Sequence, residues 1–276
     1  MVPEMGMGNR RFAIDFHNHI VPGVDDGARS LEESLEAVER MVGEGIGGIC
    51  TTPHLNASIT HNPVRLEQRL NKVNDAWEKV SSVVKDRFPQ LELWSGYEIM
   101  LDIPDPNLSD LRLRLAGTPF VLIEWPRLQI PPRTEQVISK ICADGYLPII
   151  AHPERYEGIR RNIDIAGSWR RAGAYLQVSC GSFVDRYGKE VKEAAFDFLA
   201  RGWVDYLSSD FHARRHLSIH FNDVKDLFHD NDGYEQIKLL TMSNPRRMLL
   251  GEAPLPVPEL VIKQRLLDRF KNIFKG

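Results

Sequence analysis

Short apolar runs alternate with longer amphipathic segments along almost the whole chain. Apolar runs of about this length, bounded by polar residues, glycine or proline, predict buried strands. We predict seven strands, at residues 11–16, 47–52, 91–97, 119–125, 146–151, 174–179 and 203–208. The segments between them have helical spacing and predict helices near 31–43, from 63 onward, and near 133–144, 160–172, 187–201 and 244–250.

Two of the predicted helices begin with clear local signals. Ser30 is followed three residues later by Glu33, which is the pattern of a capping box. Asn62 precedes Pro63, and asparagine can cap a helix whose first turn accepts proline. Both signals predict helix starts at these places.

Polar, reactive side chains follow nearly every predicted strand. Strands that alternate with helices indicate parallel strands joined by right-handed crossovers. An open doubly wound sheet gathers its site at one switch point, whereas a barrel brings the ends of all its strands to one face. Because six of the seven strands supply candidate ligands, we expect a seven-stranded α/β barrel formed by a single domain, residues 1–276.

Composition limits the classes of function. The chain has 276 residues, 42% hydrophobic and 26% charged, and its net charge of -3 disfavours nucleic acid as a partner. The opening "MVPEMGMGNRR" lacks the apolar region of a secretory signal, and no apolar run approaches the roughly 20 residues of a membrane span. Three widely spaced cysteines indicate a reducing compartment, so we expect a cytoplasmic protein.

The stretch 258–276 differs in character from the rest of the chain. Its apolar residues recur at helical spacing, and it carries five basic and two acidic residues. A basic amphipathic helix can lie on a membrane or dock a partner. We favour a final helix packed on the domain, because most helices of globular proteins have one apolar face.

The polar residues at the strand ends have the chemistry of metal ligands. In the stretch "IDFHNHIVPGVDDG", His17 and His19 face the same way if they continue a strand. Nine histidines and carboxylates would share one barrel mouth: His17, His19, Asp26, His54, Glu98, Glu124, His152, Asp210 and His212. Burying so many charged groups without cations costs several kcal/mol for each ion.

Nine ligands are too many for one ion and suit two or three divalent ions. Nitrogen and oxygen ligands without thiolate favour manganese, iron or zinc over magnesium or calcium.

The motifs "DFHNH…DDG", "TPH", "GYEI", "IEWP", "AHPER" and "SSDFH", in this order, resemble the polymerase and histidinol phosphatase (PHP) superfamily. Within it, residues 12–250 resemble the bacterial capsule-type manganese-dependent protein-tyrosine phosphatases. The resemblance implies a distorted (β/α)7 TIM-like barrel with a trinuclear site. It also implies a role in capsule or exopolysaccharide synthesis, with the tail of a bacterial tyrosine autokinase as substrate.

The resemblance also implies roles for individual residues. It implies three ligand groups, with Glu98 shared by the first two: His17, His19, Glu98 and Asp210; Glu98, Glu124 and His152; and Asp26, His54 and His212. Arg155 matches an arginine that contacts the substrate phosphate. The family usually has a second arginine after the "SSDFH" motif, and Arg214 and Arg215 are the candidates here, although both stand earlier than expected.

The expected mechanism is attack on phosphorus by a hydroxide that bridges the metal ions. Asp210 and a metal-bound water are alternative general acids. Asp25 either orients a metal ligand or belongs to the turn before Gly27.

Three other functions compete with this hypothesis. Cys180 and Arg186 fit the C-x5-R signature of cysteine-dependent phosphatases, in which a thiolate attacks phosphorus, but the pattern is short and weak. A small phosphoester such as histidinol phosphate is an alternative substrate. A metal-stabilised module that binds phosphopeptides without hydrolysis is an alternative from a different class.

Overall fold

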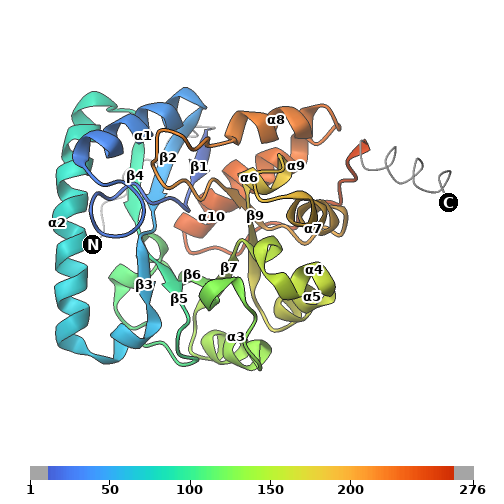
Figure 1. Cartoon of the computed structure of the whole chain (residues 1–276), viewed down its shortest axis with the longest axis horizontal. Helices are drawn as coiled ribbons and strands as arrows, with labels where there is room; N and C mark the ends of the chain where they lie inside the picture. Colours follow the sequence, from blue (N-terminus) through green and yellow to red (C-terminus); the bar gives the residue numbers. More distant parts are fainter. Residues whose placement is uncertain (1–11, 264–276) are drawn as a thin grey trace.

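Parallel strands and helices alternate through the computed structural model, which describes residues 12–263 (Figure 1). The strands are β1 (Ala13–Asp15), β2 (Ile46–Thr51), β3 (His54–Asn56), β4 (Glu92–Ser95), β5 (Glu98–Met100), β6 (Phe120–Glu124), β7 (Leu147–Ala151), β8 (Tyr175–Ser179) and β9 (Tyr206–Ser208). Each predicted strand region contains at least one of these strands. The parallel α/β organisation is therefore confirmed.

The strands form two sheets in which every pair is parallel. One sheet has three strands in the order β1-β2-β4, and the other has six in the order β3-β5-β6-β7-β8-β9. At two places the chain passes from one sheet to the other within two residues. It continues from β2 to β3 through Thr52 and Pro53, and from β4 to β5 through Gly96 and Tyr97.

These two interruptions remain side by side, because Gly96 N donates to Thr51 O (2.9 Å) and Glu98 N donates to Pro53 O (3.2 Å). His54 is then the first residue of β3, and Glu98 the first residue of β5. The sequence pattern predicted strands that end at residues 52 and 97, so β3 and β5 were missed. A proline in one strand and a glycine in the other account for the breaks.

The chain segments that follow β1 and β9 also lie beside each other. Asp210 N donates to His17 O (2.8 Å), and His19 N donates to Phe211 O (2.9 Å). Asn18 and Phe211 form an isolated parallel bridge. Residues from the two ends of the sequence therefore meet at the carboxyl ends of the strands.

Helices cover the outer faces of both sheets. They are α1 (Leu31–Gly43), α2 (Pro63–Arg87), α3 (Thr134–Ala143), α4 (Glu157–Arg161), α5 (Asp164–Arg171), α6 (Cys180–Phe183), α7 (Lys189–Ala200), α8 (Phe221–His229), α9 (Tyr234–Lys238) and α10 (Asn244–Leu249). In Figure 1, α1 and α2 lie together on the side of the three-stranded sheet, and α3 and α5 lie on the side of β7 and β8.

The predicted helix starts are confirmed with one change of partner. Ser30 accepts from Glu33 N (3.2 Å), and Asn62 accepts from Arg65 N (3.1 Å) with Pro63 as the first helical residue. The Glu33 carboxylate, however, accepts from Arg29 N (2.8 Å), so the reciprocal half of the capping box is absent.

Other helical predictions were less accurate. The helix predicted at 160–172 is two helices, α4 and α5, and α8 and α9 were not predicted. In the stretch 258–276, where one helix was predicted, residues 258–262 are not helical. Leu260 and Ile262 are nevertheless buried, and 264–276 lie outside the described residues. Between residues 12 and 263, no helix combines the length and the apolar character that a bilayer crossing needs.

Both faces of the main sheet are buried. On β6, Phe120 and Leu122 pack in one apolar cluster, and Val121 and Ile123 pack in the other. Such continuous apolar runs are typical of parallel strands covered on both faces. The polar ends of these strands therefore stand on a rigid, close-packed base.

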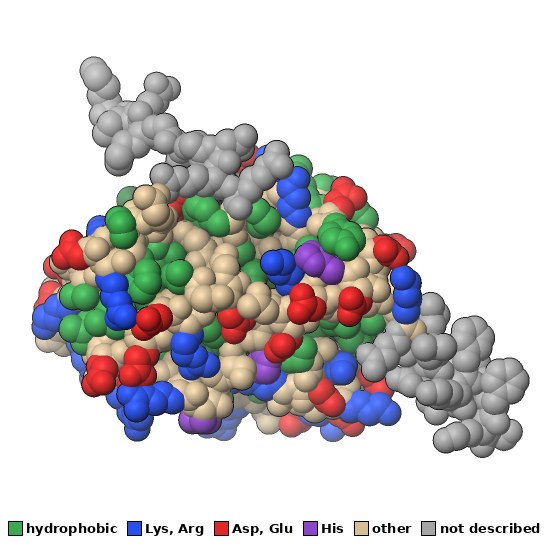
Figure 2. All heavy atoms as spheres, turned by 90° about the horizontal axis from the view of Figure 1, so that it is seen from above, with side chains coloured by type: hydrophobic (Ala, Val, Ile, Leu, Met, Phe, Trp, Pro, Cys, Tyr) green, Lys and Arg blue, Asp and Glu red, His purple; other side chains and the backbone are tan. Residues whose placement is uncertain are grey.

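The outer surface has mixed charge. On the face shown in Figure 2, Lys and Arg side chains are interspersed with Asp and Glu side chains. Such a face has no extended field of one sign and agrees with the small net charge of -3.

Candidate metal centre

The fold brings all nine predicted ligands into one cluster at the carboxyl ends of the strands. Four overlapping groups have ligand atoms within 4.8 Å of one another: His19, Asp26, His54 and His212; His17, His152 and Asp210; His17, His19 and Glu98; and His54, Glu98 and Glu124. Every predicted ligand belongs to at least one group. The side chains come from segments that are up to about 200 residues apart, so folding alone assembles the cluster.

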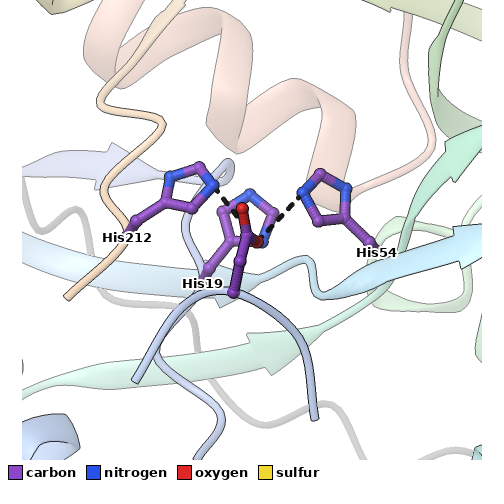
Figure 3. Close-up of side chains that lie close together, drawn as sticks. His19, His54 and His212 are labelled. Carbon is purple, nitrogen blue, oxygen red and sulfur yellow. Dashed lines mark ion pairs between the residues drawn. The ribbon is translucent and has the colours of Figure 1, made fainter. Parts of the chain in front are cut away.

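Three histidines and Asp26 form the outer part of the cluster (Figure 3). Asp26 Oδ1 lies 3.4 Å from His54 Nε2 and 3.5 Å from His212 Nε2. The His19 and His212 rings are stacked with centroids 4.1 Å apart. The Asp26 side chain is 68% exposed, so solvent and small molecules can reach this part of the site.

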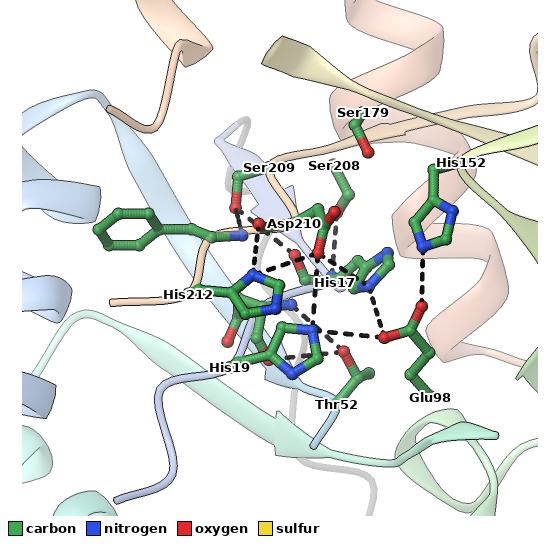
Figure 4. A network of polar contacts seen from close by, with 12 residues as sticks. His17, His19, Thr52, Glu98, His152, Ser179, Ser208, Ser209, Asp210 and His212 are labelled. Carbon is green, nitrogen blue, oxygen red and sulfur yellow. Dashed lines mark hydrogen bonds and ion pairs between the residues drawn. The ribbon is translucent and has the colours of Figure 1, made fainter. Parts of the chain in front are cut away.

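Glu98 is the centre of the inner part, where it points at several histidines (Figure 4). Its Oε2 lies 3.1 Å from His17 Nε2 and 3.0 Å from His54 Nδ1. Its Oε1 lies 3.1 Å from His152 Nε2. Glu98 is 1% exposed, so its charge must be balanced by these neighbours or by cations.

Several of these close atoms make no hydrogen bond. Among the described residues, Glu98 Oε2, His17 Nε2, His19 Nε2 and His54 Nδ1 are buried without a hydrogen-bond partner. Buried polar atoms of this kind are rare because each one costs about 1–3 kcal/mol. Lone pairs that converge without a proton between them are what divalent cations bind, so these residues fit a metal centre.

The remaining predicted ligands complete the inner part. Asp210 Oδ1 lies 3.4 Å from His17 Nε2 and 3.6 Å from His19 Nε2. Glu124 Oε1 lies 3.3 Å from His54 Nδ1, and Glu124 Oε2 lies 3.9 Å from His152 Nε2. His19 and His54 each belong to two of the observed groups, so the implied division of ligands among three ions stays a prediction.

Two buried partners fix the orientation of His17 and His19. Gln177 Oε1 lies 2.8 Å from His17 Nδ1, and Asp25 Oδ2 lies 2.9 Å from His19 Nδ1. When Nδ1 donates to an oxygen, the Nε2 lone pair is free to face the cluster. Asp25 also accepts from Gly27 N (2.9 Å), so it both orients a ligand and holds the turn.

Gln177 was missed by sequence reasoning. The signal was a single amide side chain within the otherwise apolar strand at 174–179.

Asp15 is a second residue whose role in the site the sequence analysis did not predict. It is buried at the end of β1, and its carboxylate accepts from Ser208 Oγ (2.5 Å), Ser209 N (2.9 Å) and Ser209 Oγ (2.6 Å). Ser208 Oγ in turn accepts from His17 N (3.0 Å). Burial raises the pKa of Asp15 despite these donors. This network ties β1 to β9 directly beneath the cluster.

Two predicted ligands occupy strained backbone conformations. His152 has φ 36° and Asp210 has φ 51°, both in the left-handed region. Such conformations cost of order 1–3 kcal/mol in non-glycine residues and are concentrated at functional sites. They turn the two side chains into the cluster immediately after β7 and β9.

The three predicted phosphate-binding arginines have different surroundings. Arg155 Nη1 donates to Asp210 Oδ2, which places its guanidinium at the cluster. Arg214 donates to Asp26 O (2.8 Å) and Glu33 (3.2 Å), and Arg215 donates to Glu36 (2.6 Å). Glu33 and Glu36 belong to α1, so the second and third arginines are engaged there. Their contact with phosphate stays a prediction.

The carboxylates and histidines of the cluster shift each other's pKa values in opposite directions. Burial disfavours the imidazolium of His19, but the carboxylates of Asp210 and Asp25 outweigh it and raise the pKa of His19 well above its ordinary value. Burial likewise opposes the Glu98 carboxylate, but the charge of His17 and a bond from His152 hold the pKa of Glu98 well below its usual range. Without a cation, this pairing favours a proton on His19 and an ionised Glu98.

Cys180 lies in a different environment. It begins α6 and is buried. Burial raises the pKa of the Cys180 thiol well above its ordinary value, and nearby Asp15 raises it further. A reactive thiolate needs a lowered pKa and access to substrate, so this cysteine has the properties of a structural residue.

The chain matches a known family over most of its length. The family model for capsular polysaccharide synthesis proteins CpsB/CapC matches residues 13–250. The tyrosine-protein phosphatase YwqE of Bacillus subtilis strain 168 is 28% identical over 260 residues, which cover 93% of this chain and 99% of YwqE. The tyrosine-protein phosphatase CpsB of Streptococcus pneumoniae is 27% identical over 253 residues, which cover 87% of this chain and 99% of CpsB.

Two solved structures are similar to this chain. A crystal structure from work on YwqE and CpsB, described as unique metal-dependent tyrosine phosphatases, superposes with a TM-score of 0.74 at 28% identity, covering 90% of this chain and 99% of that chain. The phosphotriesterase homology protein of Escherichia coli superposes with a TM-score of 0.50 at 12% identity, covering 87% of this chain and 99% of that chain. The second likeness shows a shared fold alone.

Substituting Gly27 by alanine should disrupt the outer part of the cluster. A Cβ at Gly27 would overlap the His19 carbonyl oxygen and lie 2.5 Å from His19 Cβ, so the backbone of a predicted ligand must move. We expect a loss of about 2 kcal/mol or more in the free energy of unfolding, measured by denaturant titration, and lower metal content. Gly43→Ala is the control, because a Cβ there meets nothing within 4 Å. Equal stability of the two variants would contradict the prediction.

Raising the pH should increase the stabilisation that manganese gives. The raised pKa of His19 means that protonation stabilises the metal-free fold below pH about 6.5, and that this contribution is lost as the pH rises through the folded-state pKa. Metal ions need neutral imidazole, so they compete better at higher pH. The difference in Tm with and without Mn²⁺ should grow between pH 6 and pH 8, and a constant or shrinking difference would argue against metal at these histidines.

Proposed function

Because the chain belongs to the CpsB/CapC family of capsular polysaccharide synthesis proteins, we propose that it is a metal-dependent protein-tyrosine phosphatase. The observation that carries this function is that buried ring nitrogens of His17, His19 and His54 converge on Glu98 Oε2 and that none of these atoms makes a hydrogen bond. Two relatives named as tyrosine phosphatases, YwqE and CpsB, match this chain over 99% of their own length.

The cluster suits the chemistry of a phosphate monoester. Divalent cations held by these nine residues would neutralise the charge of the phosphoryl group and lower the pKa of the water that attacks phosphorus. Arg155 offers a planar fork of donors for phosphate oxygens, and its bond to Asp210 holds that fork beside the cluster. A hollow lined by Asp26, His54, Leu55 and Ile59 lies beside the cluster and would hold the phenol ring of the substrate.

Asp210 has two further properties that bear on its role. Burial disfavours its charge, but His17 and Arg155 hold the pKa of Asp210 well below its usual range. An ionised carboxylate is suited to bind a cation rather than to donate a proton. We therefore favour a ligand role for Asp210, and a water molecule is the better candidate for the acid that protonates the phenolate.

Several finer features belong to the same proposal. The nitrogen and oxygen donors without thiolate favour two or three manganese ions, with iron or zinc as alternatives. The hydrogen bonds between the segments after β1 and β9 support a distorted (β/α)7 barrel formed by one domain. The net charge, the cysteines and the family support a cytoplasmic enzyme that acts on the phosphorylated tail of a bacterial tyrosine autokinase.

Two alternatives are less well supported. Histidinol phosphate would need the same metal chemistry, but the relatives at 27–28% identity are named for phosphotyrosine. A module that binds without hydrolysis would tolerate loss of a ligand, whereas all nine predicted ligands are present and converge.

Phosphate release should depend on metal and on Glu98. Purified protein with Mn²⁺ should hydrolyse a phosphotyrosyl peptide faster than histidinol phosphate, and chelation should stop the reaction. Glu98→Gln should lower kcat/KM by roughly a hundredfold or more, since even residues that only orient ligands contribute 10–100-fold. Glu78→Gln is the control, because Glu78 is exposed on α2. Full activity of metal-free protein, or of Glu98→Gln, would refute the mechanism.

Cys180→Ser should keep most of the phosphatase activity. The thiol is buried and its raised pKa leaves it protonated near neutral pH, so it takes no part in the attack on phosphorus. We expect kcat/KM within about threefold of the unaltered protein, because serine fills nearly the same volume. Loss of activity with unchanged Tm and metal content would instead support a cysteine nucleophile.

A further inference from the structure

We propose that Arg186 supplies a second guanidinium group for the substrate phosphate, beside Arg155, with Tyr187 as the support that both arginines share. This inference rests on the proposed phosphatase function and adds a residue to the same site. It also gives a role to Arg186, which the C-x5-R pattern singled out for a different chemistry.

One aromatic ring connects the two arginines. The Arg155 Cζ lies 4.5 Å from the centroid of the Tyr187 ring, and the Arg186 Cζ lies 5.0 Å from the same centroid. Arg155 itself donates to Asp210 in the metal cluster. Three contacts therefore connect Arg186 to the predicted ligand Asp210, by way of Tyr187 and Arg155.

Arg186 has no carboxylate partner within ion-pair distance in the part of the chain that the structure describes. Its guanidinium makes one long hydrogen bond, from Nη1 to Ser218 O (3.5 Å). Two like charges held against one ring repel each other, and only Arg155 has a carboxylate to offset its charge. A doubly charged anion that accepted from both planar forks would relieve this repulsion.

Local structure holds Arg186 in place. The segment after α6 turns back sharply, with Asp185 at φ 69° and Arg186 N donating to Gly181 O (3.1 Å). A Cβ at Gly181 would lie 2.8 Å from Arg186 Cδ and 3.3 Å from Tyr187 Cε2, so the arginine stem and the ring pack directly on the α6 backbone. Such close packing reduces the entropy lost when the guanidinium binds an anion.

The contact with Ser218 places Arg186 against the segment that follows the "SSDFH" motif. The family resemblance leads us to expect a second phosphate-binding arginine in that segment. Arg214 and Arg215 occupy the segment but pair with the α1 carboxylates Glu33 and Glu36. Arg186 contacts the end of this segment at Ser218 from the turn after α6, and it has no such carboxylate partner among the described residues.

The test compares substitutions of Arg186 on two substrates. Arg186→Ala and Arg186→Lys would be assayed with Mn²⁺ on a phosphotyrosyl peptide and on para-nitrophenyl phosphate, which has no flanking residues. The binding of inorganic phosphate to the manganese-loaded protein would be measured by calorimetry. Arg160→Ala is the matched control, because Arg160 is partly exposed on α4 and pairs with Glu190. Metal content and Tm would be recorded for each variant.

We expect Arg186→Ala to lower kcat/KM by about 10–100-fold on both substrates, and to weaken phosphate binding by a similar factor, as loss of a charge-assisted hydrogen bond does. Arg186→Lys should recover part of the loss, since it keeps the charge without the fork. Tyr187→Phe, which keeps the ring, should retain activity, whereas Tyr187→Leu should not. Metal content should stay unchanged in all of them.

Three outcomes would overturn the proposal. Arg186→Ala could match Arg160→Ala in kcat/KM and in phosphate binding. The loss could be confined to the peptide, in which case Arg186 contacts residues that flank the phosphotyrosine. Phosphate binding could be weakened only together with metal content, which would make Arg186 a structural residue. If the unaltered protein hydrolyses neither substrate, the proposed function fails, and phosphate calorimetry still decides the role of Arg186.

Discussion

The buried carboxylate of Glu98 is the constraint on which the rest of the site depends. It is 1% exposed, and three histidine nitrogens lie within 3.1 Å of its two oxygens. Glu98 Oε1 is hydrogen-bonded to His152, but Glu98 Oε2 has no hydrogen bond and faces the unbonded ring nitrogens of the other histidines. Cations between these ligands would stabilise the folded protein, whereas the uncompensated buried charge destabilises it when no cation is bound. The surrounding structure must therefore hold these ligands in place.

That support comes from departures from regular structure at the strand ends. Breaks at Pro53 and Gly96 let β3 and β5 begin with His54 and Glu98, while left-handed backbone after β7 and β9 turns His152 and Asp210 inward. Each departure is unfavourable locally. The close-packed sheet beneath, together with the bonds from Asp15 to Ser208 and Ser209, offsets this cost and fixes the directions of the ligands.

The sequence predicted those features that depend on neighbouring residues. Ser30 and Asn62 start helices because a cap acts within four residues, and the strands are recognisable because buried parallel strands are apolar throughout. The nine ligands were predicted because polar residues follow apolar runs and because the motifs that contain them resemble the PHP superfamily. Gln177, β3 and β5 were missed, since their roles depend on partners far away in the sequence. The α8 and α9 helices were missed, and neither begins with a side chain that caps it.

The roles of the arginines were also difficult to predict from the sequence, because they depend on residues that are far away along the chain. Arg155, Arg186 and Arg214 have similar chemistry, and no local pattern separates their roles. The surroundings of each arginine separate their roles. Arg155 pairs with the predicted metal ligand Asp210, and Arg214 pairs with Glu33 on α1. Arg186 is held against an aromatic ring that also contacts Arg155, with no carboxylate within ion-pair distance between residues 12 and 263. A guanidinium that shares a ring with Arg155 and has no counter-ion is suited to bind an anion together with Arg155, and the anion of a phosphatase is its substrate.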